Sequence, residues 1–591
     1  MDALMSRPQH RGRLLAALGI AAATCVALVA STGAAPAVAK PGEPQAPQEV
    51  KLQMLALNDF HGQLQPSTSS SSGTINGVFA GGVEYLATHL QTLRSQAAAE
   101  GRHSVTVAAG DLIGATPLLS AAFHDEPTIE AMNEMGLEVS SVGNHKFDEG
   151  WRELVRMQEG GCIQDGPEGA DNQNSCPDHE FTGADFQYLS ANVFHEDSGK
   201  TVLPGTTVKT YDGVKVGFIG MTLENTPNIV TKAGVAGLRF TDEVQTANAA
   251  AKVLHEQGVK SIVVLVHEGG FPSDPKAYNS CPGISGPIVD INNGLSAKID
   301  AVVTGHTHQA YNCTLADPKG DPRLVTSGAS IGRLVTDIDL TINSRSGDVV
   351  RSSAVATNRV VTRDVAKSET ITSLIGLYNT LVAPIANEVI GSLTGTSTIT
   401  RSSDASGESP LGNLIADLQK ADDSAVSGGK VPELAFMNPG GIRTDLVAKP
   451  DGSVTYGAAF NVQPFNNYVV SMDMTGTQIL TLLQQQWSGT NAASPKILQV
   501  SGITYSYTHP AGGAYTLQPQ TVKVNGVAID PARTYRVVAN SFLSDGGDGF
   551  GAFAEATDKF FGGLDIDALA AYLAEHTPYS PVPTDRITVA P

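Results

Sequence analysis

The chain has 591 residues, of which 41% are hydrophobic and 16% are charged. This length exceeds what a single hydrophobic core usually supports, so at least two domains are expected. Glycine and proline show no fixed period, which argues against collagen-like and repeat architectures. The formal net charge of −21 disfavours non-specific binding to nucleic acid or anionic membranes, since either would need a basic face.

The N-terminal segment 1–39 has the pattern of a signal peptide. Three arginines precede an apolar run from Leu14 to Val29, and the small residues Ala37 and Ala39 then flank Val38. A membrane-spanning helix is the alternative, but the apolar run is short and rich in alanine. We therefore expect cleavage after Ala39 and an exported product without a membrane span. Without this segment the chain carries 35 basic and 58 acidic residues, a net charge of −23.

Four cysteines remain in the expected mature chain: Cys162, Cys176, Cys281 and Cys313. An even number in an exported protein suggests two disulfides. Three pairings are possible, and we favour Cys162–Cys176 with Cys281–Cys313 because each closes the shorter loop. Metal-binding thiols are the alternative, but no C-x-x-C spacing occurs.

Short apolar runs alternate with polar loops and helical stretches between residues 50 and 363. Such runs are typical of buried strands in an α/β domain. The predicted strands are Leu52–Leu57, Val105–Ala109, Tyr188–Val193, Val214–Met221, Ile262–Val266 and Ala301–Thr304. Two polar segments, Ser67–Gly73 and Gly160–Glu180, are predicted to be surface loops.

Residues 364–390 predict a helix that connects two domains. They contain few turn formers, and apolar residues recur at helical spacing: Ile371, Leu374, Ile375, Tyr378 and Leu381. The region 391–591 again mixes strands (Ile497–Tyr507, Val522–Ile529, Arg536–Ala539) with helices (Leu411–Leu418, Thr475–Gln485). We therefore predict two α/β domains joined by a helix.

Polar segments with potential metal ligands stand at the ends of predicted strands in the first domain. They are Asn58–Gly62, Gly110-Asp111, Gly143–Asp148, His267 and Gly305–His308. Functional groups on open α/β sheets gather at the carboxyl ends of strands. Any one segment alone could be an ordinary turn with a hydrogen-bonded side chain. It is the ordered set that indicates a site.

In this order, the segments resemble the calcineurin-like metallophosphoesterase superfamily over residues 50–340. The resemblance implies a four-layer α/β/β/α sandwich and two divalent metal ions. Imidazole and carboxylate donors suit Zn, Mn, Co or Fe, and the absence of thiolates disfavours a closed structural zinc site. By the same resemblance, Asp59, His61 and His308 hold the first ion, Asp111 bridges, and Asn144, His267 and His306 hold the second.

The resemblance also implies how the site acts. Two ions about 3.5–4 Å apart activate a water for in-line attack on phosphorus. His145 contacts the phosphate, and Asp148 fixes the tautomer of His145, so the two form a general-acid pair. The superfamily commonly has glutamate where Lys146 stands. That position is not a ligand, so we expect the departure to alter local charge more than chemistry.

Four later segments resemble the 5′-nucleotidase C-terminal domain: Ser409–Leu414, Asn438–Arg443, Gln463–Asn467 and Ser541–Phe550. The resemblance implies a nucleotide substrate whose base stacks between Phe465 and Phe542. It implies that Asp548 accepts hydrogen bonds from the ribose hydroxyls. Asn438, Arg443 and, with a less certain alignment, Arg401 would contact phosphate or ribose and supply local positive charge.

These residues together predict an exported hydrolase that releases nucleoside and phosphate from nucleoside 5′-phosphates. A UDP-sugar hydrolase and a 2′,3′-cyclic-nucleotide phosphodiesterase of the same superfamily remain alternatives, because the same residues would serve them. A binding protein with a relic metal site would lack ligands, and none is missing. A related sulfur-compound hydrolase would not need the aromatic pair. Nothing in the sequence indicates an oligomeric state.

Overall fold

The computed structural model describes residues 49–67, 73–163, 174–510 and 513–590, all within one compact unit, Pro47–Pro591. The predicted signal peptide and its cleavage site lie outside the described residues. So do residues 68–72 and 164–173, which make up parts of the two predicted surface loops. In the part of the chain that is described, no helix has the length and apolar character needed to cross a membrane.

Two β-sheets, both built from strands that end before Val361, stack face to face. The first has the strand order β16-β15-β1-β4-β5-β6, with β17 also paired to β15, and the second has the order β13-β14-β12-β11-β9-β8. The strands of the first sheet are β1 (Glu49–Leu57), β4 (His103–Ala109), β5 (Val139–Ser141), β6 (Gln187–Leu189), β15 (Leu334–Asn343), β16 (Asp348–Val349) and β17 (Val355–Val360). Those of the second are β8 (Thr206–Tyr211), β9 (Val214–Thr222), β11 (Ser261–His267), β12 (Ala301–Thr304), β13 (Ala310–Ala316) and β14 (Pro322–Gly328).

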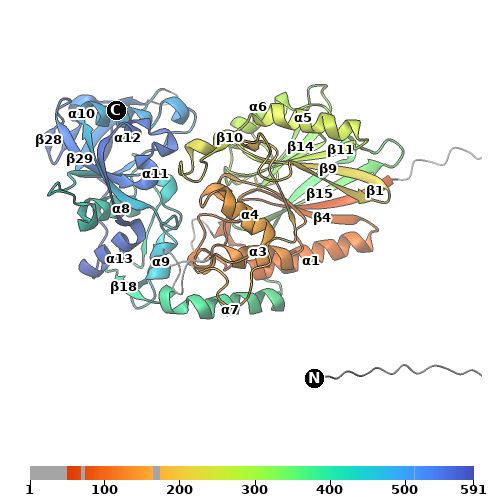
Figure 1. Cartoon of the computed structure of the whole chain (residues 1–591), viewed down its shortest axis with the longest axis horizontal. Coiled ribbons are helices and arrows are strands. Elements are labelled where there is room, and N and C mark those ends of the chain that lie inside the picture. The colour runs from red at the N-terminus through yellow and green to blue at the C-terminus, as the bar shows by residue number, and fades with distance from the viewer. Residues whose placement is uncertain (1–48, 68–72, 164–173, 511–512, 591) are drawn as a thin grey trace, which may run out of the picture. The chain divides into compact units, whose positions relative to one another are not determined.

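Apolar side chains from both sheets form a core between them. Met54 and Val105 of the first sheet and Phe218, Val263 and Leu265 of the second are all fully buried there. Helices α1 (Val83–Ala99), α3 (Glu126–Glu134) and α4 (Trp151–Glu159) cover the outer face of the first sheet, and α5 (Glu243–Glu256) and α6 (Pro287–Gly294) cover that of the second (Figure 1). The predicted four-layer α/β/β/α sandwich is therefore confirmed.

The strands that precede the predicted ligands run parallel to one another within each sheet. In the first sheet β1, β4 and β5 are parallel neighbours, and in the second β11 is parallel to both β9 and β12. Parallel strands place their carboxyl ends on the same edge of a sheet. The fold thus brings residues far apart in sequence to one edge of the sandwich.

One predicted strand, Tyr188–Val193, is wrong as a single element. Strand β6 ends at Leu189, and β7 (Val193–His195) pairs instead with β10 (Leu238–Phe240). The reason is Asn192, whose side chain donates to the carbonyl of Thr222 (2.6 Å) and accepts from the amide of Thr222 (3.1 Å). These bonds draw the backbone away from the first sheet after Leu189.

Helix α7 (Glu369–Ala386) lies where a connecting helix is predicted. It packs on the first half of the chain, since the ring of Tyr378 lies 5.0 Å from that of Phe123 and its hydroxyl donates to Glu130 (3.0 Å). Its buried residues are Ile371, Ile375, Tyr378 and Val382, whereas Leu374 and Leu381 are only partly buried.

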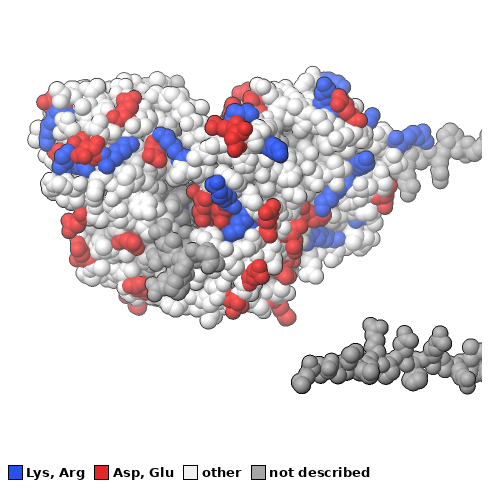
Figure 2. All heavy atoms as spheres, in the orientation of Figure 1, with Lys and Arg blue, Asp and Glu red and all other residues white. Residues whose placement is uncertain are grey.

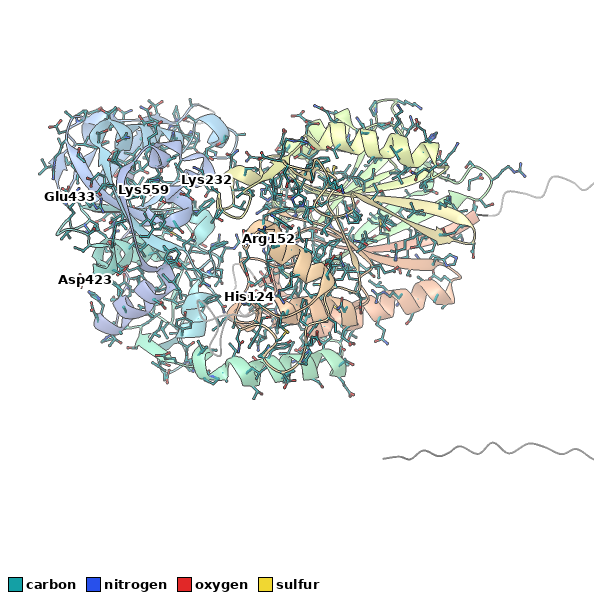
Figure 3. All side chains as sticks on the ribbon, viewed as in Figure 1. His124, Arg152, Lys232, Asp423, Glu433 and Lys559 are labelled. Atoms are coloured by element: carbon teal, nitrogen blue, oxygen red, sulfur yellow. A yellow bond between two sulfur atoms is a disulfide. The ribbon has the colours of Figure 1, made fainter. Side chains whose placement is uncertain are left out.

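A third sheet, built from strands after residue 389, forms the centre of the C-terminal half. Its order is β24-β20-β29-β23-β30, with β20 (Leu434–Met437), β23 (Tyr468–Thr475), β24 (Gln499–Ser501), β29 (Thr534–Asn540) and β30 (Thr557–Leu564). Apolar side chains of α8 (Pro410–Ala421) and α13 (Asp565–Glu575) pack on one face, and those of α10 (Gly476–Gln485) and α12 (Gly551–Ala554) on the other. Lys559 of the edge strand β30 (Figure 3) donates to the carbonyl of Ser544 in α11 (Ser541–Ser544).

Two predicted strands of this half are divided. The predicted strand Ile497–Tyr507 breaks at Gly502 into β24 and β25 (Ile503–Thr508), and Val522–Ile529 forms a hairpin of β27 (Lys523–Val524) and β28 (Val527–Ala528). Gly502 has φ +72°, and a Cβ there would lie 2.2 Å from the carbonyl oxygen of Glu433. Glycine is therefore required at this break.

Acidic and basic side chains are interspersed over the molecular face drawn in Figure 2. The whole chain has a net charge of −21. An anionic ligand therefore depends on cations placed locally around it rather than on the average charge of the protein.

Both predicted disulfides, Cys162–Cys176 and Cys281–Cys313, are confirmed. The first closes a loop after α4, and the second joins the segment before α6 to β13. The thiols are thus unavailable as metal ligands.

Removing Cys281–Cys313 should cost more stability than removing Cys162–Cys176. The cysteines are 32 residues apart in the first case and 14 in the second. Loop closure in the unfolded chain then predicts losses of roughly 4 and 3 kcal/mol in the free energy of unfolding. Thermal unfolding of the C281S/C313S and C162S/C176S double variants measures the difference. A larger fall in midpoint for the shorter loop would contradict this account.

Candidate functional site

All seven predicted metal ligands lie together at the carboxyl ends of five strands. Asp59 and His61 follow β1, Asp111 follows β4, Asn144 follows β5, His267 is the last residue of β11, and His306 and His308 follow β12. Three of these strands belong to the first sheet and two to the second. The cluster therefore lies where the carboxyl edges of the two stacked sheets meet.

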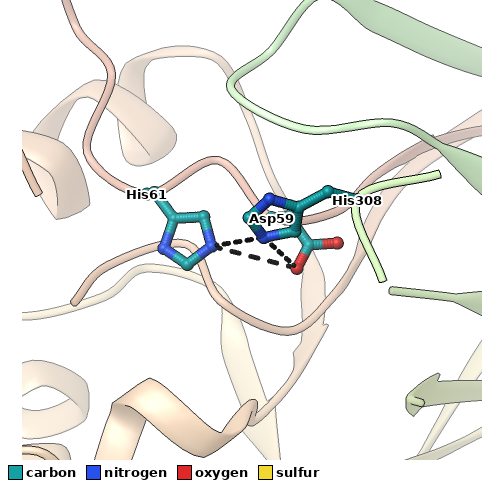
Figure 4. Close-up of side chains that lie close together, drawn as sticks. All are labelled: Asp59, His61 and His308. Carbon is teal, nitrogen blue, oxygen red and sulfur yellow. Dashed lines mark hydrogen bonds and ion pairs between the residues drawn. The ribbon is translucent and has the colours of Figure 1, made fainter. Parts of the chain in front are cut away.

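Asp59, His61 and His308 form one group of the cluster (Figure 4). The Nε2 atoms of His61 and His308 are 3.0 Å apart, and His308 Nε2 is 3.4 Å from a carboxylate oxygen of Asp59. The opposite ring nitrogen of His61 bonds to the carbonyl of Gly114 at 2.8 Å. In a neutral His61 that bond keeps the proton on Nδ1. Nε2, which faces the group, then has a free lone pair that can bind a metal ion.

Asp59, Asp111 and His267 form a second group that shares Asp59 with the first. His267 Nδ1 bonds to the carbonyl of Ala109 at 2.8 Å, and its Nε2 lies 2.8 Å from an oxygen of Asp111. Beside this group, the side-chain oxygen of Asn144 lies 3.1 Å from His306 Nδ1. The backbone amide of His306 in turn donates to Asp59 at 3.0 Å, which links the two sets.

The backbone around the cluster is unusually constrained. Five of the seven residues have positive φ values: Asp59, His61, Asp111, His306 and His308. Such conformations are uncommon for residues other than glycine and collect at functional sites. Gly143 lets the side chain of Asp111 lie close to the backbone, since a Cβ at Gly143 would lie 2.1 Å from Oδ1 of Asp111. The glycine in the Gly-Asn-His segment is thus needed to let Asp111 reach the cluster.

The carboxylates of the cluster are held in the ionised state. Burial alone would raise the pKa of Asp59, but His308 and its other imidazole neighbours lower that pKa to about 2. The pKa of Asp111 is likewise well below its usual value, because His267 and His145 outweigh burial. Burial acts to lower the pKa of His267, yet Asp111 raises it to about 9. The cluster therefore contains buried negative charge that attracts cations.

The donor set fits divalent metal ions. Two buried ionised carboxylates need compensating positive charge, which an ion supplies without a proton. His267 Nε2 is fully buried and, among the described residues, has no hydrogen-bond partner of good geometry. Imidazole nitrogens, carboxylates and one amide oxygen are the ligands that Zn²⁺, Mn²⁺, Fe and Co²⁺ accept. Burial also lowers the pKa of His306, to about 3, so this imidazole is neutral and able to coordinate.

His145 and Asp148 form a hydrogen-bonded pair beside the cluster. His145 Nδ1 lies 2.7 Å from Asp148 Oδ2, so the carboxylate holds the proton on Nδ1 and leaves Nε2 free for another partner. The backbone amide of His145 donates to Asp111 at 3.1 Å, and its ring lies 5.2 Å from that of His61. The pair thus has the geometry that its predicted role requires.

A cavity of about 580 Å³ joins the cluster to residues of the C-terminal half. Its walls include Asn144, His145, Asp148 and His306 on one side, and Asn438, Arg443, Phe465, Phe542 and Asp548 on the other. Five of the six residues predicted to bind substrate are therefore in one cavity with the predicted catalytic pair. The sixth, Arg401, lines an adjoining cavity of about 410 Å³ together with Arg443, His61 and His308.

The two predicted aromatic residues are held in different ways. The ring of Phe465 lies 5.8 Å from that of His145 with 27° between their planes. The Cζ atom of Arg443 lies 5.8 Å from the centroid of the Phe465 ring. The ring of Phe542 packs on Gly547, where a Cβ would lie 2.5 Å from it. Phe465 thus lies against His145, and Phe542 lies against the Gly-rich loop.

The arginines bring positive charge into an otherwise acidic molecule. Burial lowers the pKa of Arg443 to about 10, and the nearby charge of Arg401 acts in the same direction. Arg401 Nη1 donates to the carbonyl of Arg443 at 2.7 Å, so the side chain of one arginine positions the backbone of the other. Both arginines remain charged at neutral pH.

Sequence reasoning missed two residues near the aromatic pair. Asn467 accepts hydrogen bonds from Ser541 Oγ (3.0 Å) and from the amide of Phe542 (3.3 Å), which ties the Phe465 loop to α11. Lys496 forms an ion pair with Asp548 and lines the cavity. Asn467 stands within a segment that the sequence singled out, but Lys496 belongs to no motif.

A further group with metal-type donors lies along the same cavity. It comprises His124 (Figure 3), Glu149 and Glu153. Both oxygens of Glu153 accept hydrogen bonds from Arg156, at 2.7 to 3.1 Å, and His124 Nδ1 bonds to Glu149 at 2.9 Å. These side chains already satisfy one another, which distinguishes them from the cluster around Asp59.

Part of the chain matches a known domain family, and the chain is similar to a solved structure. A family model described as "5′-nucleotidase, C-terminal domain" matches residues 389–555. The structure of a 5′-nucleotidase precursor from Thermus thermophilus is similar, with a TM-score of 0.72 and 25% identity, over 91% of this chain and 99% of that one.

Two curated relatives match most of this chain. The endonuclease YhcR of Bacillus subtilis is 31% identical over 84% of the chain, and the cell wall protein Lmo0130 of Listeria monocytogenes is 33% identical over 86%. The chain spans 37% of the length of the first and 65% of the length of the second.

The stacked sheets and the histidine–carboxylate cluster at their strand ends have the arrangement that the resemblance to metallophosphoesterases implies. The C-terminal match and the similar solved structure both point to one group of such proteins, the 5′-nucleotidases. Residues 389–555 match the 5′-nucleotidase C-terminal domain, and the chain is similar in structure to a 5′-nucleotidase precursor.

Replacing Gly143 by alanine should damage the cluster, because the new Cβ would meet Asp111 at 2.1 Å. Overpacking of this kind costs about 1–3 kcal/mol, and it would also move a carboxylate out of the cluster. We expect a lower midpoint of thermal unfolding and a smaller rise in midpoint when Mn²⁺ is added.

Gly376→Ala is the matched control. Gly376 lies in α7, is exposed and has no atom within 4 Å of an added Cβ, so alanine should be neutral or slightly stabilising. A Gly143→Ala variant as stable and as responsive to Mn²⁺ as Gly376→Ala would contradict the role given to Gly143.

Proposed function

We propose that the protein hydrolyses nucleoside 5′-phosphates to nucleoside and phosphate. The observation that carries the proposal is the shared cavity, which contains donors suited to metal ions and an aromatic pair suited to a nucleobase. The match of residues 389–555 to the 5′-nucleotidase C-terminal domain supports the reaction class. The proposed domains are 50–363 for the phosphoesterase, 364–390 for the connecting helix and 391–591 for substrate binding.

The proposal assigns two divalent ions to the cluster. Asp59, His61 and His308 would hold one, Asn144, His267 and His306 the other, and Asp111 would bridge them. When bound, such a pair of ions polarises the phosphate and lowers the pKa of a water that attacks phosphorus. The low pKa values of both carboxylates support this assignment, since they keep the ligands deprotonated at neutral pH.

His145 would act on the phosphate itself. The bond from Nδ1 to Asp148 leaves Nε2 directed to another partner, and protonated His145 can donate to a phosphate oxygen or to the leaving oxygen of the nucleoside. Asp148 holds the proton on Nδ1 and fixes the orientation of the ring. Arg443, buried in the same cavity, would neutralise part of the phosphate charge.

The C-terminal residues would select the substrate. Phe465 and Phe542 offer two aromatic faces to a base, and any base can stack between them because each has a π-face. Asp548 and Asn438 are hydrogen-bonded to each other, line the same cavity and would contact the ribose. Arg401, in the adjoining cavity, would act through Arg443, whose carbonyl it holds.

We also propose that the protein works outside the cytoplasm. The predicted signal peptide supports export, and two disulfides are typical of proteins that fold in oxidising compartments. A relative that matches 86% of the chain is a cell wall protein.

Removing metal ions should abolish activity. We expect EDTA to stop phosphate release from AMP, and excess Mn²⁺, Co²⁺ or Zn²⁺ to restore it. Asp111→Asn should lower kcat by at least about 100-fold, because it weakens the residue shared by both ions. Asp212→Asn, at an exposed carboxylate remote from the cluster, is the control. Activity that survives both EDTA and Asp111→Asn would refute the two-metal proposal.

Loss of either aromatic ring should weaken nucleotide binding. Stacking of one base on one aromatic side chain contributes about 1–3 kcal/mol, so Phe542→Ala should raise KM for AMP about tenfold or more. The KM for p-nitrophenyl phosphate, which has no base, should change little. Phe465→Ala should raise KM similarly and also lower kcat, because Phe465 packs on His145.

The exposed Phe271, outside the cavity, gives the control variant Phe271→Ala. Equal changes in KM for AMP and p-nitrophenyl phosphate in the Phe542→Ala variant would exclude a base-binding role.

A further inference from the structure

The carboxylate expected to receive the ribose is already engaged by the protein. Oδ2 of Asp548 accepts a hydrogen bond from Asn438 Nδ2 at 2.9 Å, and Oδ1 pairs with the ammonium of Lys496. The side chain of Asp548 is 11% exposed, whereas that of Lys496 is 32% exposed. A ligand that enters this end of the cavity therefore meets a cation more readily than a carboxylate.

Asp548 cannot turn easily to offer a free oxygen. Its backbone has φ +57°, and its carbonyl accepts from Asn491 Nδ2 at 2.8 Å. Its partner Asn438 is held in turn by Asn540, whose Nδ2 donates to the side-chain oxygen of Asn438 at 3.0 Å. This network fixes the carboxylate, and the carboxylate fixes the ammonium of Lys496.

Lys496 retains capacity to bind an anion. An ammonium has three N–H donors, and in the described part of the chain Asp548 is the one side-chain partner of Lys496. The side chain also lines the cavity. In dinucleotide-binding folds, a carboxylate near the ribose binds its hydroxyls, whereas a cation at that place accommodates a ribose phosphate. Here both are present, and the cation is the more exposed.

We propose that this end of the cavity binds a phosphate carried on the 2′ or 3′ oxygen of the ribose, so that nucleoside 2′,5′- and 3′,5′-bisphosphates are substrates. Lys496 contacts the ribose phosphate while the 5′-ester is hydrolysed. Water adds to the 5′ phosphorus, the bond from phosphorus to the 5′ oxygen breaks, and that oxygen takes a proton. The products are the nucleoside 2′- or 3′-monophosphate and inorganic phosphate. The hydrolytic part of this inference rests on the proposed function.

The expected gain in affinity is moderate because acidic groups lie nearby. Asp548 already pairs with Lys496, and Asp545 lines the same cavity. These negative charges repel a phosphate. We therefore expect the charge-assisted hydrogen bond from Lys496 to the phosphate to improve binding about tenfold. Mutation of Lys496 should therefore remove the preference for a ribose phosphate, while hydrolysis of the 5′-ester continues.

A binding experiment tests the ribose site independently of hydrolysis. Calorimetry in EDTA would compare adenosine with adenosine 3′-monophosphate and adenosine 2′-monophosphate. We expect one or both monophosphates to bind the wild type about tenfold more tightly than adenosine does. Lys496→Met should abolish this difference, and Lys496→Arg should retain it. Lys523→Met, at an exposed lysine of β27 remote from the cavity, should leave it unchanged.

Kinetics then test the substrates. In the Lys496→Met variant, KM for adenosine 3′,5′- or 2′,5′-bisphosphate should rise about tenfold more than KM for AMP does. Equal binding of adenosine and its monophosphates by the wild type, or an equal rise in every KM, would overturn the inference. If the wild type binds the adenosine monophosphates more tightly than adenosine but does not hydrolyse AMP, the proposed function is wrong and the ribose-phosphate site is not.

Discussion

The structure around the site depends on two carboxylates, Asp59 and Asp111, that are buried and ionised at the junction of two sheets. An uncompensated buried charge costs several kcal/mol, so every neighbouring group must supply positive charge or a hydrogen bond. The side chains of His267 and His308 and the backbone amides of His145 and His306 do part of this. The left-handed backbone at both aspartates and the glycine at 143 follow from the same requirement, because they let the donors converge.

The sandwich explains how such a costly arrangement is held in place. Parallel strands deliver their following residues to one edge, and the apolar core between the sheets fixes the separation of those edges. The second ring nitrogens of His61 and His267 bond to backbone carbonyls at 2.8 Å, which orients both imidazoles. The cluster is therefore part of the folded scaffold rather than of a flexible loop.

Much of this could be predicted from sequence, because a polar residue directly after an apolar run marks a strand end without tertiary information. The ordered Asp-x-His, Gly-Asp, Gly-Asn-His and Gly-His-x-His segments therefore indicated the cluster. The features that the sequence did not reveal depend on contacts between residues far apart in the chain. The end of β6 is set by bonds from Asn192 to Thr222, and Lys496 meets Asp548 across 52 positions of the chain. Neither contact leaves a local pattern in the sequence.

The two halves divide the chemistry of the cavity between them. The first half contributes the imidazoles of His145 and His306 and the carboxylate of Asp148, while the second contributes aromatic rings, amides and cations. Phe465 joins the two sets, since its ring lies against His145 on one side of the cavity and Asn467 ties its loop to Phe542 on the other. A ligand that contacts Phe465 therefore touches the residue that packs on the imidazole of His145. Contact with a ligand at Phe465 and the orientation of His145 are physically coupled through this single ring.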